Sequence, residues 1–222
     1  MLILFRVPQP DVARSTRPLT LGEGLKGYGR LVMEPAPRAA MLAYVLMFAG
    51  IGLFVPYFPT WLERVVGIKG QSVALLFLAG GLTNVVAAPL AGRLSDRIGR
   101  KPLVIASCLL FSALMAACTY AVTGLGTAMV FFSLAMLSVA MRLAPLQSLL
   151  TALVPPERRG VMMSGAIALG QLGMAVAAGV AGLVYAAYGF AGNTLGAAVA
   201  ILAMAAVVWF GLPEPTKAGS KG

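Results

Sequence analysis

The chain has 222 residues, of which 59% are hydrophobic and 11% are charged, and its mean hydropathy is +0.90. A soluble protein of this length could not bury so much apolar surface, so the composition predicts a membrane protein. The net charge of +10 falls between the apolar runs, which favours lipid headgroups over nucleic acid as the partner. The chain lacks histidine, phosphate-binding loops and paired catalytic carboxylates, so we expect no enzyme, cofactor or metal site.

The first 37 residues are predicted to form a basic cytoplasmic segment or linker. Prolines, glycines and charges alternate there, with one short helix expected near residues 21–32. At the other end, residues 213–222 are predicted to form a short cytoplasmic tail.

Between these segments lie six apolar stretches, each long enough to cross a hydrocarbon core of about 30 Å. They are continuous rather than alternating in hydropathy, which favours helices over the strands of a barrel. We therefore predict an all-α membrane protein with a six-helix transmembrane bundle over residues 38–212. The expected spans are 39–62, 72–91, 102–122, 127–154, 161–188 and 190–212.

The distribution of Lys and Arg predicts the orientation of this bundle. Fourteen of these residues lie in the amino-terminal segment, the second and fourth loops and the tail, whereas two lie in the first loop. By the positive-inside rule, both termini are expected in the cytoplasm, with the bundle in the inner or plasma membrane.

The loop between the second and third predicted spans is unusually rich in charge and glycine. Its cations can meet anionic headgroups, its glycines suit a tight turn and close approach, and its one carboxylate can pair with a cation or a helix amino terminus. The residues are Gly92, Asp96, Arg97, Gly99, Arg100 and Lys101.

This loop resembles the Gly-x-x-x-Asp-Arg-x-Gly-Arg-Lys signature that joins the second and third helices of each half of a major facilitator superfamily protein. Residues 145–160 are similar to the family's loop between the fourth and fifth helices, and the glycine-rich helix that follows is similar to its eleventh helix. The resemblance covers residues 38–213 and implies the carboxy-terminal half of a secondary transporter of the efflux-permease kind. It also implies a gating role for the signature loop.

Because a family member has two six-helix halves, we expect a second half, either an identical copy or a separate chain. The alternative is a non-transporting subunit that acts as a scaffold or assembly factor in a larger membrane complex. The lack of a carboxylate inside any span, where proton coupling would need one, favours this alternative.

Five residues are candidates for the substrate cavity. Arg142 is the one charge deep inside a predicted span, where its helix is implied to line the cavity and attract an anionic or polar small molecule. Its alternative role is to snorkel or to bond helix carbonyls. Asn84 and Gln171 can contact substrate or join helices, and Tyr44 and Phe48 can contact substrate or pack.

Two further features concern helix shape and packing. Pro56 and Pro59 remove backbone hydrogen bonds near the outer end of the first span, so we expect a bend there that serves a gate. Small residues recur at four-residue spacing in the fifth span, from Gly173 to Ala186, which predicts close packing against another helix.

Overall fold

The computed structural model describes residues 33–213, and every long element in this part of the chain is a helix. Residues 1–32 of the predicted linker, with its short helix at 21–32, and residues 214–222 of the tail lie outside the described residues, whereas residues 35–37 of the linker already belong to the first described helix. Within residues 33–213, five segments are long and apolar enough to cross a membrane, which agrees with an all-α membrane protein. The elements are α2 (Pro35–Phe54), α3 (Phe58–Trp61), the π-helix η1 (Leu62–Val66), α4 (Gly70–Ile98), α5 (Arg100–Ala121), α6 (Leu125–Ala152), the 3-10 helix η2 (Pro156–Arg158) and α7 (Arg159–Gly211).

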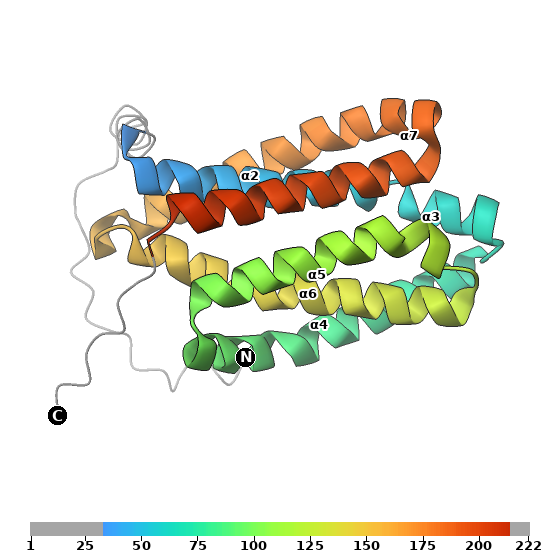
Figure 1. The fold of residues 1–222 in the computed structure, drawn as a ribbon, viewed down its shortest axis with the longest axis horizontal. Helices are drawn as coiled ribbons and strands as arrows, with labels where there is room; N and C mark the ends of the chain where they lie inside the picture. Colours follow the sequence, from blue (N-terminus) through green and yellow to red (C-terminus); the bar gives the residue numbers. More distant parts are fainter. Residues whose placement is uncertain (1–32, 214–222) are drawn as a thin grey trace, which may run out of the picture.

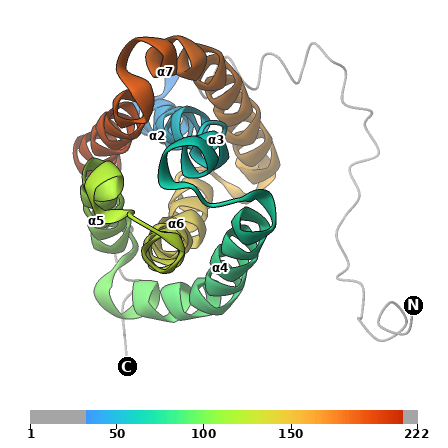
Figure 2. The ribbon, with the colours of Figure 1, turned by 90° about the vertical axis from the view of Figure 1, so that its right-hand side faces the viewer.

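The helices run side by side as a bundle (Figure 1). Helix α2 packs along α7, α4 packs along α6, and α5 lies against both α6 and α7. Viewed along the bundle in Figure 2, α2 and α6 lie nearer the centre, while α4, α5 and α7 surround them. This arrangement explains why α4 is mostly exposed on its outer side, whereas one face of α2 is deeply buried.

Helix α7 doubles back on itself. Its 53 residues would extend about 80 Å as one straight helix, far more than a bilayer requires. Gly189 interrupts it with φ 67° and ψ −168°, and Figure 1 shows two arms lying next to each other. The break that the predicted spans 161–188 and 190–212 leave at Gly189 is therefore present as a tight hairpin, because glycine alone readily adopts this backbone conformation.

The helix ends gather at two opposite ends of the bundle (Figure 1). One end holds the start of α2, the α4–α5 junction, η2 and the end of α7. The other end holds α3, η1, the α5–α6 turn and the bend of α7. We call the first the signature-loop end and the second the α3 end.

Close contacts between α2 and α7 explain the small residues of the fifth predicted span. A Cβ added to Gly52 would lie 2.5 Å from the carbonyl oxygen of Met174, and one added to Gly173 would lie 3.0 Å from that of Val45. The neighbour predicted for this span is therefore α2 of the same chain. Glycine at both positions lets the two backbones approach.

An aromatic cluster fills the core at the α3 end. Phe58 is fully buried and lies within ring-contact distance of six other aromatic rings, the nearest being Phe54 with 4.7 Å between centroids. Such pairs typically contribute about 0.5–1.5 kcal/mol each beyond area burial. The other rings around Phe58 are Trp61, Phe77, Phe131, Phe132 and Phe190.

Candidate functional site

The signature loop is a single-residue junction between two helices. Helix α4 ends at Ile98 and α5 begins at Arg100, so Gly99 alone makes the turn, with φ 101° and ψ 152°. This backbone region is nearly restricted to glycine, which confirms the turn predicted for Gly99. Gly92 differs from the prediction, because it lies inside α4 and an added Cβ would meet nothing within 4 Å. No close approach therefore requires Gly92 among the described residues.

Lys101 ties two helices together at this end. Its Nζ donates a hydrogen bond of 2.8 Å to the carbonyl oxygen of Leu212, and it lies 5.7 Å from the centroid of the Trp209 ring. The last carbonyls of a helix lack intrahelical partners, so a lysine here satisfies one end of α7. The sequence suggested a headgroup contact for this residue and gave no signal for the contact with α7.

Two further arginines bind protein groups at the same end. Arg158 lies 3.6 Å from a carboxylate oxygen of Glu34, and the Nε of Arg159 donates to the carbonyl oxygen of Thr151 at 3.0 Å. Both side chains of the ion pair are about half exposed, so the pair contributes at most about 1 kcal/mol. It nevertheless links η2 to the start of α2.

Asp96, Arg97 and Arg100 make no ion pair within residues 33–213. Asp96 and Arg97 are exposed, and Arg100 is half-buried. The pairing expected for Asp96 is therefore not formed inside this part of the chain, and its gating role stays a prediction.

Arg142 is the most deeply buried charge in the described bundle. It lies in α6, it is 0% exposed, and none of its three guanidinium nitrogens has a hydrogen-bond partner among residues 33–213. The guanidinium carbon lies 4.5 Å from the centroid of the Phe111 ring, and the thiol of Cys108 is also beside it. The alternative in which Arg142 snorkels or bonds helix carbonyls is not what the structure shows.

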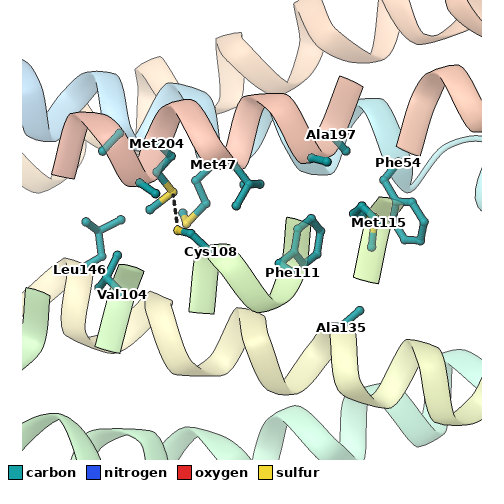
Figure 3. Close-up of a cluster of buried hydrophobic side chains, with 14 of the residues drawn as sticks. Met47, Phe54, Val104, Cys108, Phe111, Met115, Ala135, Leu146, Ala197 and Met204 are labelled. Carbon is teal, nitrogen blue, oxygen red and sulfur yellow. Dashed lines mark hydrogen bonds between the residues drawn. The ribbon is translucent and has the colours of Figure 1, made fainter. Parts of the chain in front are cut away.

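The Cys108 thiol beside Arg142 belongs to the hydrophobic core. Figure 3 shows the neighbouring core, where the Cys108 thiol points at the thioether of Met204 at 3.9 Å, with Met47 beside them. A cation–π contact is worth roughly 2 kcal/mol when it is desolvated, whereas burying an unpaired charge costs several kcal/mol. The described bundle, residues 33–213, therefore holds this cation at a net cost in free energy.

Tyr44 is a second buried polar group without a hydrogen bond. It is 1% exposed, and the side chain of Gln147 lies near its hydroxyl without forming a hydrogen bond in proper geometry. Phe48, one turn along α2, stacks on Tyr44 with 6.0 Å between ring centroids and presses against Gly170 of α7. Packing between α2 and α7 is thus one role of Phe48.

Asn84 and Gln171 do not join this buried group. Asn84 is half-buried in α4, Gln171 is exposed on α7, and neither forms a hydrogen bond with another described residue. The expected joining of helices by these two side chains is therefore absent within residues 33–213. Contact with a substrate or a partner stays a prediction for both.

One buried polar contact between helices that the sequence predictions do not include belongs to Asn193. This fully buried side chain donates from Nδ2 to the carbonyl oxygens of Leu53, at 3.0 Å, and of Ala181, at 3.1 Å. One amide thus joins the end of α2 to both arms of α7. The signal was available, since Asn193 is a polar residue inside an apolar span.

The two prolines of the first predicted span lie where α2 is interrupted. Helix α2 ends at Phe54, Pro59 lies in the first turn of α3, and η1 stops at Gly67, whose φ is 79°. Pro56 lacks an N–H and cannot bond the carbonyl of Gly52. The helix therefore changes direction at the α3 end, and the gating role of this break stays a prediction.

Comparison with known proteins gives the family. The model of the Major Facilitator Superfamily matches residues 40–222. The chain is 36% identical over 67 residues to the quinolone resistance protein NorA of Staphylococcus aureus (strain Mu50), which covers 30% of this chain and 17% of that protein. It is 35% identical over 65 residues to multidrug resistance protein 2 of Bacillus subtilis (strain 168), which covers 29% and 16% respectively. These matches span less than a fifth of either relative. Because the family model covers well over half of the chain, this integral membrane protein belongs to the major facilitator superfamily.

Proposed function

We propose that this chain is one six-helix half of a secondary transporter of the drug-efflux kind. The observation that carries the proposal is the family match over residues 40–222, together with similarity to two proteins named for drug resistance. In this proposal the half alternates access to a central cavity by rocking against a second six-helix bundle. The substrate is a small organic molecule.

Counting six spans requires that the two arms of α7 each cross the membrane. The arms on either side of Gly189 are 159–188 and 190–211, and each is long enough to span a core of about 30 Å. An even number of crossings places the start of α2 and the end of α7 on the same side of the membrane. Figure 1 shows both at the signature-loop end. We propose that this signature-loop end is cytoplasmic, because it holds most of the Lys and Arg within residues 33–213.

The orientation can be tested by labelling single cysteines in a background that lacks Cys108 and Cys118. We expect Gly126→Cys to react with an impermeant maleimide in intact cells and Ser95→Cys to react only after permeabilisation. Labelling of Ser95→Cys in intact cells would reverse the proposed orientation.

A face of α7 supports the need for a second bundle. The residues Ala168, Gln171, Ala175 and Gly179 are exposed and follow one another at three- or four-residue spacing. Small side chains with a single amide suit helix–helix packing in a membrane better than contact with lipid. We propose that a second half, provided as another copy or another polypeptide, covers this face.

Transport itself is tested by reconstitution. The chain is placed in liposomes alone and together with a candidate six-helix partner, and efflux of a fluorescent quinolone is followed. We expect flux only with both halves present. No flux in any combination, with both chains inserted, would contradict the proposal.

A second candidate is a subunit that supports assembly of a larger membrane complex without transporting. It is favoured by the position of the acidic residues, since proton coupling would need a carboxylate inside a span. Within 33–213 the acidic residues all lie near helix ends: Glu34, Glu63, Asp96 and Glu157. A scaffold predicts that removing the chain abolishes complex assembly, while no solute moves in the reconstituted system. A transporter predicts flux that depends on a partner.

A further inference from the structure

An apolar groove lies along the outer side of α4. It is open, measures about 440 Å³, and is lined by one face of α4 together with one residue of α6. Leu137 precedes Arg142 by five residues, which places the two about 140° apart around α6. The groove is therefore separate from the buried arginine. Its lining residues are Leu82, Thr83, Val86, Ala87, Leu90 and Leu137.

The groove has no polar group free to bind a ligand. Its one hydroxyl, Thr83 Oγ1, donates to the carbonyl oxygen of Ala79 at 2.9 Å in its own helix. The remaining lining side chains are aliphatic. Most are larger than Ala168, Ala175 and Gly179 on α7, and a groove between leucine and valine side chains suits a flexible hydrocarbon chain better than a closely packed helix.

Two arginines continue the face of α4 that lines the groove. Arg93 and Arg97 follow Val86 by seven and eleven residues, which places each roughly 20° from it around the helix. Both are exposed, and neither has an ion-pair or hydrogen-bond partner among residues 33–213. Asp96 lies about 80° from Val86 around the helix and three residues from Arg93, and it forms no ion pair with either arginine among residues 33–213.

The distances along α4 fit one leaflet of a bilayer. Leu82 and Arg93 are eleven residues apart, or about 16 Å at a rise of 1.5 Å per residue. Half of a hydrocarbon core of about 30 Å is about 15 Å. If the helix spans the membrane, the far end of the groove lies near the midplane and the arginines lie at the level of the headgroups.

We propose that this face of α4 binds one anionic phospholipid, with an acyl chain in the groove and the phosphate on Arg93 and Arg97. Both parts of the lipid have a matching surface. The aliphatic groove suits the acyl chain, and the two unpaired guanidinium groups suit the phosphate. The site lies one turn from Gly99, so a bound lipid contacts the α4 end of the signature loop.

The headgroup half of the site is tested by native mass spectrometry of the full chain, released from detergent with phosphatidylglycerol or phosphatidylcholine. The wild type is expected to retain one phosphatidylglycerol in preference to phosphatidylcholine. The double variant Arg93→Gln/Arg97→Gln is expected to lose about thirtyfold in affinity for the anionic lipid, since each cation near the surface contributes about a factor of five. The matched control, Arg64→Gln/Lys69→Gln, removes the same charge at the α3 end and is expected to bind as the wild type does.

The acyl-chain part of the site is tested with Val86→Trp. The indole ring of this variant fills the groove from an exposed position and leaves the two arginines in place. This variant is expected to lose phosphatidylglycerol while its thermal unfolding midpoint stays near that of the wild type. Displacement of the lipid by millimolar inorganic phosphate would show a phosphate site without a chain site and would overturn the proposal. Equal binding of the two lipids would overturn it too, as would equal losses of affinity in the test and control variants. Cross-linking of a Val86→Cys variant to another protein bundle would also overturn it, because that bundle would then cover the groove.

Discussion

Replacing Arg142 with methionine should make the chain more stable and should abolish the transport that we propose for it. Methionine keeps an unbranched side chain of similar length but removes the charge. In the structure the guanidinium has no hydrogen bond within residues 33–213, and one ring, that of Phe111, lies against it. Replacement of buried charges by apolar residues of similar volume typically ranges from neutral to stabilising by about 4 kcal/mol. We therefore expect Arg142→Met to raise the free energy of unfolding by about 1–3 kcal/mol.

The sign of this change is informative. If the cation were paired inside the bundle, its removal would leave a buried partner unsatisfied and cost about 3–5 kcal/mol. Unfolding is measured by steric trapping in bicelles, which reports a free energy for a membrane protein under native conditions. The control is Arg64→Met, an exposed arginine at the α3 end, which we expect to change stability by less than about 0.5 kcal/mol. A clear loss of stability in Arg142→Met with an unchanged control would refute the reasoning.

Three other substitutions test the described contacts. Asn193→Leu should lower the free energy of unfolding by about 1–3 kcal/mol, because it leaves the Leu53 carbonyl without its donor. The control, Thr194→Ala, should lower it by less, because the hydrogen bond of Thr194 stays within its own helix. Equal effects would contradict the joining role of Asn193. Gly99→Ala should lower the free energy of unfolding by about 1–3 kcal/mol, because it forces a side chain into a backbone conformation restricted to glycine. The control, Gly92→Ala, should be neutral or stabilising in the same unfolding assay. A tolerated Gly99→Ala would argue against the observed turn. Phe58→Ala should cost about 3–5 kcal/mol by opening a cavity among the rings, and a loss below 1 kcal/mol would contradict the packing.

Much of the architecture can be predicted from the sequence. In a bilayer, long apolar stretches require helices, and glycines between them permit tight turns. Uninterrupted apolar stretches must form helices, since no other open structure satisfies its backbone there. Gly99 and Gly189 adopt positive φ at the two turns where the sequence predicts tight connections. Pro56 and Pro59 coincide with the end of α2 for the same kind of reason, since proline cannot donate the bond that continues a helix.

The partners of the polar side chains could not be predicted in the same way. Lys101 was assigned to headgroups, yet it bonds Leu212, 111 residues away in the chain. Asn84 and Gln171 are as polar as Asn193, yet only Asn193 faces two carbonyls inside the bundle. Which amide makes a contact depends on how far each helix is rotated about its axis, and hydropathy does not determine that rotation.

The buried polar groups can nevertheless be divided by whether the bundle satisfies them. Ser107, Ser138 and Asn193 each donate to a carbonyl oxygen of the same chain, so folding the half compensates for burying them. The guanidinium of Arg142 and the hydroxyl of Tyr44 are equally buried but lack such partners within the described residues. An unpaired charge at membrane depth destabilises the fold that contains it, so the packing of the described bundle gives no reason for the presence of Arg142. The packing of residues 33–213 therefore accounts for Asn193 but not for Arg142 and Tyr44, so these two are the positions at which the substrate or second bundle of the proposed function should be sought.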